Sequence, residues 1–441
     1  MTTTPEELLE HAHTRRHVVS LALAVVVTFP GIGLRLTDAH LSDPVQALLY
    51  GLAIVGAAFL LSWGAEVAQL DISAGLAIAV LAFIAVLPEY AVDLVFAVKG
   101  GNSFQEFGPE CPPVGGGEQS PCSLALANMT GANRLLIGIG WSMVVFIAWY
   151  QWRKRGEAHR GREVVLSRQH AVELSFLAVA TLYSLTLPLK RSITLLDAAL
   201  LVTVFLLYTL RISRAPAEEP ELVGPASWIG SMSKRRRRTS VVALFVFAAT
   251  VILLSAEHFA EALVGSGKAL GVSEFLLVQW LAPLASEAPE LLVAGLYAWK
   301  LNTNAGLGTL VSSKVNQWTL LVGTLPIAFA IASGSVHGLP IVGQQREELF
   351  LTAAQSVLAV AILVSLSMSL REATMLFTLF TVQFVVGAVG PEAIHDEVRI
   401  GTGVVYLVLG AAILVSSGRG TIARLLRDGF RTPYSRLSEE P

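Results

Sequence analysis

Two glutamates that directly follow prolines stand in the middle of long apolar stretches, and they are the residues best suited to chemistry. Glu89 follows Pro88, and Glu290 follows Pro289. A charge at the bilayer centre costs about 2.5–3.5 kcal/mol on insertion scales, so it is tolerated mainly where it faces a cavity, a partner or an ion. Because proline lacks an N–H, each Pro also frees a backbone carbonyl. Carboxylates beside free carbonyls are oxygen-rich sites suited to Na⁺ or Ca²⁺.

Helical spacing adds a second acid to each site. Asp93 lies four residues after Glu89, and Glu287 lies three before Glu290, so each pair shares one face of a helix. These acids could be further ligands or proton carriers, or could pair with a buried base. For a single Pro-Glu segment, the alternative is a kink whose carboxyl is satisfied by a neighbouring helix. Two such segments in matching positions favour an ion site.

The elements that must position these acids are membrane helices. Of the 441 residues, 54% are hydrophobic and 15% are charged. The charged fraction is below the roughly 25% that is usual in soluble domains. Apolar runs of about 20 residues recur throughout, which predicts an all-α polytopic membrane protein. We expect about twelve spans, near residues 17–37, 46–68, 72–99, 121–150, 170–187, 192–211, 240–263, 273–299, 304–333, 347–369, 373–390 and 398–416.

The basic residues predict the topology. With both termini in the cytoplasm, the cytoplasmic side receives the clusters Arg153–Arg168 and Lys234–Arg238 and the C-terminal arginines, as the positive-inside rule requires. We therefore expect an integral plasma (inner) membrane protein whose arginine cluster contacts anionic headgroups. Cys111 and Cys122 then share one outer loop, where a disulfide or two free thiols are both open.

The order of features indicates an inverted repeat. We expect two five-helix repeats, at residues 46–211 and 240–390, each with a kinked Pro-Glu helix. A basic linker, 212–239, joins them, an N-terminal tail and extra helix, 1–45, precede them, and an extra helix with a basic tail, 391–441, follows. Each repeat holds a Pro-Glu segment followed by a span that opens with polar residues. Because five spans is an odd number, the second copy enters the membrane in the opposite orientation, an architecture of secondary transporters.

These motifs resemble the sodium/calcium exchanger superfamily of calcium:cation antiporters. In that family a Pro-Glu helix faces a Gly-Ser-Asn-containing helix in each repeat, and the two glutamates are the principal ion ligands. The resemblance implies a secondary antiporter with alternating access. By position it implies that Glu89 and Glu290 bind the cation, with help from the other matched positions, Ser286, Glu287, Asn133, Ser313 and Gln317. Asp93 joins the candidate ligands through its helical spacing from Glu89.

Several positions depart from the family pattern. Leu136 stands where the first repeat would offer a polar ligand, and Lys314 replaces the asparagine of the second motif, with Arg134 close by in the other repeat. A lysine among the glutamates would occupy charge space otherwise filled by Na⁺, or would exchange protons. The alternative is a fixed Lys–Glu pair of structural value only.

The expected function is exchange of Ca²⁺ or Na⁺ against H⁺ or Na⁺. No zinc-protease helix, aspartate-rich metal motif or Gly-x-Ser-x-Gly elbow points to an enzyme, and Lys314 argues against a cation channel. A sensor or scaffold that kept the fold without transport is the second hypothesis. We expect no cofactor beyond the transported cations (Ca²⁺, Na⁺ or H⁺). The expected partners are the lipid bilayer and cations, with no nucleic acid; the oligomeric state stays open.

Overall fold

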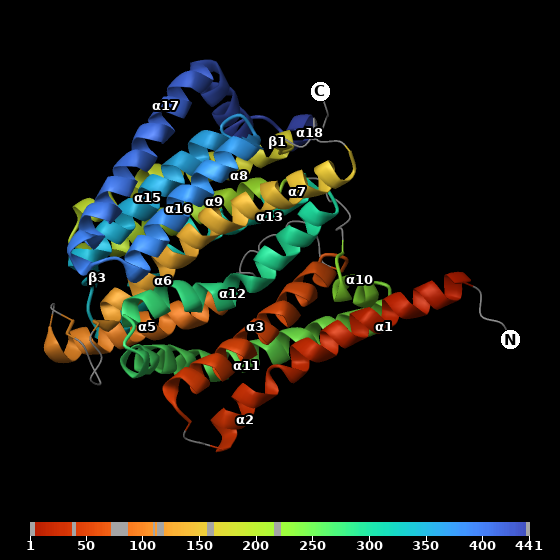
Figure 1. The fold of residues 1–441 in the computed structure, drawn as a ribbon, viewed down its shortest axis with the longest axis horizontal. Helices are drawn as coiled ribbons and strands as arrows, with labels where there is room; N and C mark the ends of the chain where they lie inside the picture. The colour runs from red at the N-terminus through yellow and green to blue at the C-terminus, as the bar shows by residue number, and fades with distance from the viewer. Residues whose placement is uncertain are drawn as a thin grey trace.

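The computed structural model describes residues 5–37, 41–71, 87–108, 111–112, 119–156, 163–215 and 222–437 of the chain. Long helices run side by side through the molecule (Figure 1). The first repeat contains α3 (Asp43–Ala68), α5 (Leu87–Phe107), α6 (Pro121–Leu135), α7 (Ser142–Lys154), α8 (Ala171–Ser184) and α9 (Leu195–Ile212). The second contains α11 (Lys234–Leu270), α12 (Glu274–Trp299), α13 (Thr303–Asn316), α14 (Val322–Ser333), α15 (Gly343–Leu363) and α16 (Leu370–Val389).

Further helices lie outside the repeats. They are α1 (Pro5–Val26), α2 (Phe29–Thr37), α10 (Pro225–Gly230), α17 (His395–Phe430) and α18 (Tyr434–Leu437). Among the described residues, nine helical stretches are long and apolar enough to cross a membrane by length and composition. A polytopic helical membrane protein is therefore confirmed. The helices α5, α12 and α15 are not among the nine, so the count of about twelve spans stays a prediction.

One expected boundary was wrong. The span expected at 347–369 ends at Leu363, because residues Ser367–Ser369 form strand β4. The last expected span, 398–416, agrees with the first part of α17, because the helical backbone of α17 breaks at Gly418 with a φ of 76°. Only glycine adopts that conformation readily. Residues 72–86 of the third expected span lie outside the described residues.

The two repeats pack into each other rather than side by side. Helix α3 lies along α11, α5 packs on α14, and α6 packs on α12. The contact between α6 and α12 requires a glycine, since a Cβ on Gly131 would lie 1.7 Å from the backbone oxygen of Gln279. This close approach brings the polar residues of α6 against the Pro-Glu segment of α12.

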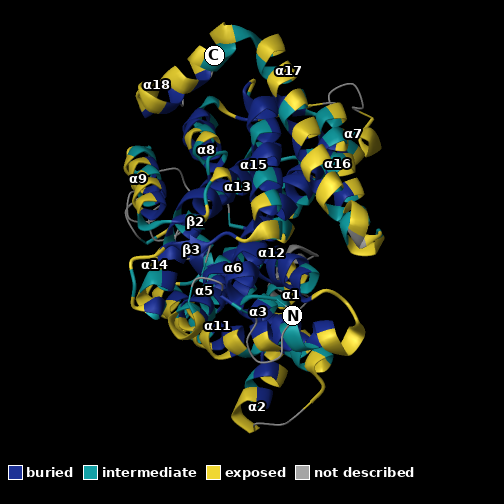
Figure 2. Cartoon of the chain, turned by 90° about the vertical axis from the view of Figure 1, so that its left-hand side faces the viewer, coloured by how far each residue is buried: buried dark blue, intermediate teal, exposed yellow. Residues whose placement is uncertain are grey.

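Short antiparallel ribbons also join the repeats. Strand β1 (Glu163–Val165) pairs with β4, and β2 (Ser192–Ile193) pairs with β3 (Leu339–Pro340). Burial follows the same division: α6 and α15 are mostly buried, whereas α9, α16 and α17 present exposed faces (Figure 2). Those faces carry apolar side chains such as Leu196, Val382 and Val415, as lipid contact requires.

The molecule has two chemically distinct ends. At the basic end, Asp71 follows α3 and pairs with Arg237 at the start of α11. At the opposite end, called here the disulfide end, Cys111 and Cys122 form a disulfide beside Gly100. The structure thus pairs the two cysteines between α5 and α6.

Candidate functional site

Helices α5 and α12 bring carboxyl groups from the two repeats together in the core. The carboxyls of Glu89 and Glu287 lie within hydrogen-bonding reach of each other, and Glu290 lies close enough to Glu89 for the two charges to interact. Glu89 is 1% exposed and Glu287 is 0% exposed. We call Glu89, Glu287 and Glu290 the acid cluster. Like charges at this distance in a dry interior repel strongly, so the cluster requires bound cations or protons.

Two amide side chains hold the neighbouring acids. Asn128 on α6 donates to Asp93 over 2.7 Å, and Gln317 donates to Glu287. The two pairs lie in different repeats, so each repeat supplies one acid–amide pair. A buried amide that donates to a carboxylate keeps the acceptor satisfied without neutralising its charge.

Lys314 on α13 is fully buried and reaches across to the first repeat. Its Nζ donates to the backbone oxygen of Asn133 over 3.1 Å and to the side-chain oxygen of Asn133 over 2.6 Å. The same Nζ lies 4.7 Å from the centre of the Trp318 ring. Within the described residues, no ion pair joins Lys314 to a carboxylate within 4 Å, although Glu287 is near enough for its charge to act on Lys314.

Each repeat contains a π-helical turn that was not predicted from the sequence. The helix of each repeat that follows the Pro-Glu segment contains a π-helical turn, at Leu136–Trp141 in the first and Gln317–Leu321 in the second. The two turns begin 181 residues apart, the same separation as between Asn133 and Lys314. Such turns are frequent at functional sites. No residue type marks a π turn in a single sequence.

A cavity of about 540 Å³ connects the acid cluster with the basic end. Glu290 and Ser313 line it, together with Glu66, Gln69 and His170. Water and ions can therefore reach Glu290 from this end. Asp93 and Gln317 do not line this cavity and are fully buried.

The comparisons with known proteins agree with this geometry. Residues 44–213 and 240–415 match the family model described as "Sodium/calcium exchanger protein". The chain belongs to that family. The crystal structure of an H⁺/Ca²⁺ exchanger named CAX matches with a TM-score of 0.84 and 40% identity, over 96% of this chain and 99% of that chain. The antiporter YfkE matches in fold alone, with a TM-score of 0.57 and 14% identity over 89% and 99% of the two chains. No curated protein matches the chain.

Family membership confirms the expected class, a membrane cation antiporter. The described part of this exchanger contains no group of three or more His, Cys, Asp or Glu side chains already placed to hold a metal ion. Instead, the acids are distributed between the Glu89–Glu287 contact and the two acid–amide pairs. Roles for individual residues are therefore proposals.

The side chains of Ser286 and Asn133 donate hydrogen bonds within their own helices. The hydroxyl of Ser286 donates to the carbonyls of Ala282 and Pro283, and the amide of Asn133 donates to Met129. In the exchanger these contacts leave the oxygen of Ser286 as an acceptor, and leave the oxygen of Asn133 facing Lys314. Helix α12 continues through Pro283 and Pro289 as one helix.

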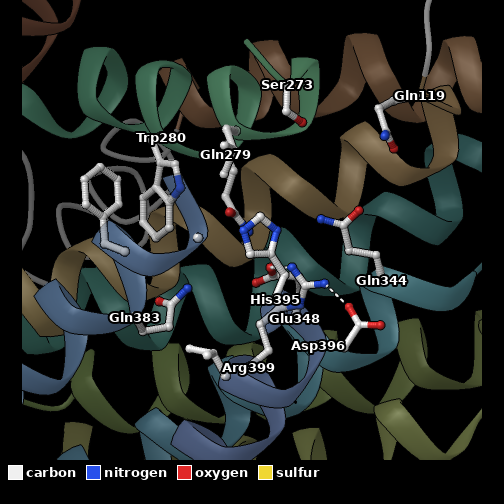
Figure 3. Close-up of a pocket in the computed structure, with 14 residues that line it drawn as sticks. Gln119, Ser273, Gln279, Trp280, Gln344, Glu348, Gln383, His395, Asp396 and Arg399 are labelled. Atoms are coloured by element: carbon white, nitrogen blue, oxygen red, sulfur yellow. Dashed lines mark hydrogen bonds and ion pairs between the residues drawn. The ribbon is translucent and has the colours of Figure 1, made fainter. Parts of the chain in front are cut away.

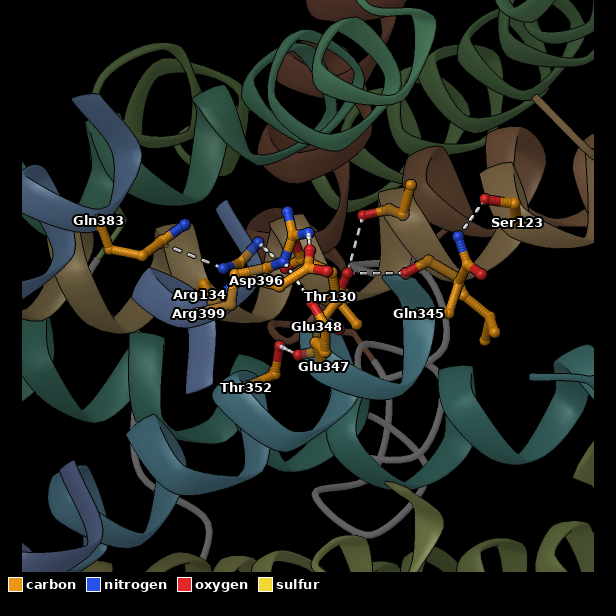
Figure 4. A network of polar contacts seen from close by, with 12 residues as sticks. Ser123, Thr130, Arg134, Gln345, Glu347, Glu348, Thr352, Gln383, Asp396 and Arg399 are labelled. Atoms are coloured by element: carbon orange, nitrogen blue, oxygen red, sulfur yellow. Dashed lines mark hydrogen bonds and ion pairs between the residues drawn. The ribbon is translucent and has the colours of Figure 1, made fainter. Parts of the chain in front are cut away.

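Arg134 does not join the acid cluster. Its guanidinium pairs with Glu348 of α15 over 2.6 Å, donates to Gln383 of α16 over 3.1 Å, and lies 4.9 Å from the centre of the Trp280 ring on α12. Arg399 of α17 extends the network to Glu347 and Glu348 (Figure 4). Both Arg134 and Glu348 are buried. The sequence placed Arg134 beside the site because it follows Asn133, but the next residue of a helix points about 100° away.

A second polar cavity, of about 250 Å³, lies at the disulfide end (Figure 3). Its lining includes Gln279, Trp280, Glu348 and Arg399. The α6–α12 contact at Gly131 and Gln279 borders it, and Glu89, Glu287 and Glu290 do not line it. In this state the acid cluster therefore opens toward the basic end.

Asn128 and Glu348 were not among the site residues predicted from the sequence. Asn128 lies in the polar opening of α6, and an amide inside an otherwise apolar span was an available signal. Glu348 and Arg399 come from helices outside both motifs. Their pairing with Arg134 depends on the tertiary arrangement, so spacing alone could not reveal it.

Proposed function

We propose that this chain exchanges Ca²⁺ for H⁺ by alternating access at the acid cluster. The observation that carries the proposal is the contact between the Glu89 and Glu287 carboxyls, which joins the two repeats. Carboxyl groups this close together in a dry interior cannot all be ionised without a cation among them, so at least one of them holds a proton when no cation is bound. A divalent cation that takes the same oxygens displaces that proton. Cation binding and proton release are thereby linked at one place.

The likeness to the H⁺/Ca²⁺ exchanger favours these ions over Na⁺ exchange. The two sequences are 40% identical over 96% of this chain. We propose Glu89, Glu287 and Glu290 as direct cation ligands. Asp93, Asn133, Ser286, Ser313 and Gln317 would complete or orient the oxygen set, as Ca²⁺ takes six to eight oxygens.

The open cavity supports a proposal for which end of the molecule faces the cytoplasm. If the basic end is cytoplasmic, as the positive-inside rule implies, the cavity that reaches Glu290 and Ser313 opens to the cytoplasm. The state described is then the inward-facing one, in a plasma (inner) membrane with both termini in the cytoplasm. Labelling of Arg235→Cys and Gln344→Cys with an impermeant maleimide in intact cells tests this. Only Gln344→Cys, at the disulfide end, should react.

Reconstituted protein tests the exchange itself. Proteoliposomes with a pH-sensitive dye inside should show a proton movement when Ca²⁺ is added outside. Glu287→Gln and Glu290→Gln should reduce the rate at least tenfold, because an amide cannot hold and release a proton. Glu106→Gln is the matched control: this glutamate lies on the helix of Glu89 but is exposed near its end.

Three results would overturn the proposal. Ca²⁺ uptake without proton movement would remove H⁺ as the counter-ion. Full activity of the Glu287→Gln and Glu290→Gln variants would show that the acid cluster is not the site. Absence of any flux, together with unchanged cation binding, would favour the sensor or scaffold hypothesis.

A further inference from the structure

Asn133 and Lys314 occupy equivalent positions of the two repeats, and they contact each other. Each lies three residues before the π-helical turn of its own repeat. We propose that the Lys314 ammonium is a tethered cation that permanently fills one monovalent cation position of the exchange site, so that Na⁺ takes no part in the exchange. This inference rests on the proposed function and names its ion selectivity.

The contacts of Nζ match an ammonium group. Three groups surround it: the backbone oxygen of Asn133, the side-chain oxygen of Asn133 and the face of Trp318. An ammonium has three N–H donors and no acceptor, whereas a neutral amine would turn a lone pair toward one of these electron-rich groups. An aromatic face also attracts a cation more strongly when both are removed from water. Lys314 is 0% exposed.

The same oxygens would suit a small metal cation. A backbone carbonyl and an amide oxygen converge on one point from α6, and Glu287 lies near enough to add negative charge. Oxygen donors of this kind bind hard cations such as Na⁺ and Ca²⁺. The ammonium therefore stands where the protein has assembled ligands for a positive ion.

The charges of the core require such an ion. Glu89, Asp93 and Glu287 are buried between the two repeats, and Glu290 lines the adjoining cavity, so four acids lie in this region. A fixed positive charge neutralises one of them in every state, whatever ion is bound. The remaining acids are then left for the exchanged cation and protons. Removal of the fixed charge should create a vacancy that a free monovalent cation can fill.

A purely structural role makes a different prediction. If Lys314 only braces α13 against α6, its loss should weaken the fold equally in every salt. If it is a tethered cation, Na⁺ should compensate for its loss. The two roles are therefore distinguished by comparing the stability of the variant in different salts, and not by comparing transport activities.

The experiment measures the melting temperature of the purified full-length chain in NaCl and in choline chloride at equal ionic strength. The wild type should melt alike in both. Lys314→Met, of similar length but uncharged, should be stabilised by Na⁺ by roughly 3 °C or more at saturation, as expected for a ligand that binds only the folded state. Lys314→Arg keeps the charge and should show no Na⁺ effect.

A double variant tests the charge argument. Lys314→Met combined with Glu287→Gln removes one positive and one negative charge, so the Na⁺ effect should disappear. Binding of ²²Na⁺ to the same samples should follow the same order, with binding only to Lys314→Met. These readouts need no transport, so a failure of Ca²⁺/H⁺ exchange in the wild type would be seen separately.

Three outcomes would overturn the inference. The first is Na⁺ stabilisation or ²²Na⁺ binding of the wild type equal to that of Lys314→Met. The second is a Lys314→Met variant that folds but ignores Na⁺. The third is a Lys314→Met variant that fails to fold even in saturating Na⁺ while the double variant folds, since Na⁺ should then have replaced the missing charge.

Discussion

Lys314 and Arg134 are both buried basic side chains, but they meet different kinds of partner. Arg134 faces the carboxylate of Glu348 at 2.6 Å, with an amide and an aromatic ring around it. Lys314 contacts the neutral oxygens of Asn133. The acids nearest to Lys314 instead contact each other or amides.

This difference separates structure from function. In the Arg134 network the buried charges of both signs pair with one another, and Arg399 also contacts Glu348, so the network can join α6, α12, α15 and α16 without taking part in exchange. A cation that leaves nearby carboxyls unpaired only partly neutralises them. The remaining charge is then available for ions that come and go.

The largest expected effect comes from breaking the complete pair. Arg134→Met removes the partner at 2.6 Å from the buried Glu348 carboxylate and leaves it only the 3.8 Å contact with Arg399, which should cost up to about 3–5 kcal/mol of folding free energy. Thermal or denaturant unfolding of the purified protein measures this. The double variant Arg134→Met/Glu348→Met should recover most of the loss, because no charge is then stranded. No loss in the single variant would contradict the structural role.

A smaller effect is expected at the acid–amide pair of the second repeat. Gln317→Leu copies the residue that the first repeat has at Leu136, and it removes the donor to Glu287. A lost hydrogen bond to a charged group costs about 1.5–3 kcal/mol, so stability and Ca²⁺-dependent proton movement should both fall. Thr319→Val is the control, since among the described residues the hydroxyl of Thr319 bonds only to the carbonyl of Val315. Equal effects of the two variants would refute a special role for Gln317.

Asp93→Asn should act on ion binding more than on folding. Asn128 already donates to Asp93, and an asparagine can accept the same bond. The loss of one negative charge should raise the Ca²⁺ concentration for half-maximal exchange roughly tenfold, or about 1.4 kcal/mol. Flux measured against Ca²⁺ concentration in proteoliposomes tests this. An unchanged half-maximal concentration would place Asp93 outside the site.

The smallest effect is expected at the basic end, where the charged side chains lie outside the membrane-spanning segments. The hydrogen bond from Arg237, aided by Arg238, holds the pKa of Asp71 below its usual value. A lowered pKa means that this contact stabilises the fold above the unfolded value of about 3.9 and that the contribution is lost as pH falls through the folded value.

Asp71→Asn should therefore lower stability by less than about 1 kcal/mol at neutral pH. Melting curves of the variant and the wild type should converge in acid. A difference that grows as the pH falls would show that the pair is not the cause.

Much of the chemistry was readable in the sequence because it depends on residue type and local spacing. Glu89, Asp93, Glu287 and Glu290 stood out as acids in apolar helices, and spacing placed each pair on one face. The resemblance between the Pro-Glu segments predicted the family, which the comparisons confirmed. Arg134 shows the limit, since its neighbour Asn133 suggested a role that the helix direction excludes.

The sequence by itself determined that this chain spans a membrane, contains a repeated motif and carries acids that are costly in lipid without a partner. These features could be predicted because hydropathy and helical periodicity are local properties. Only the tertiary structure decided which charges meet. The choice of Asn133 for Lys314 and Glu348 for Arg134 depends on how α6 packs between α12, α13 and α15. Contacts between residues 181 and 214 positions apart depend on the packed core, which no short motif encodes.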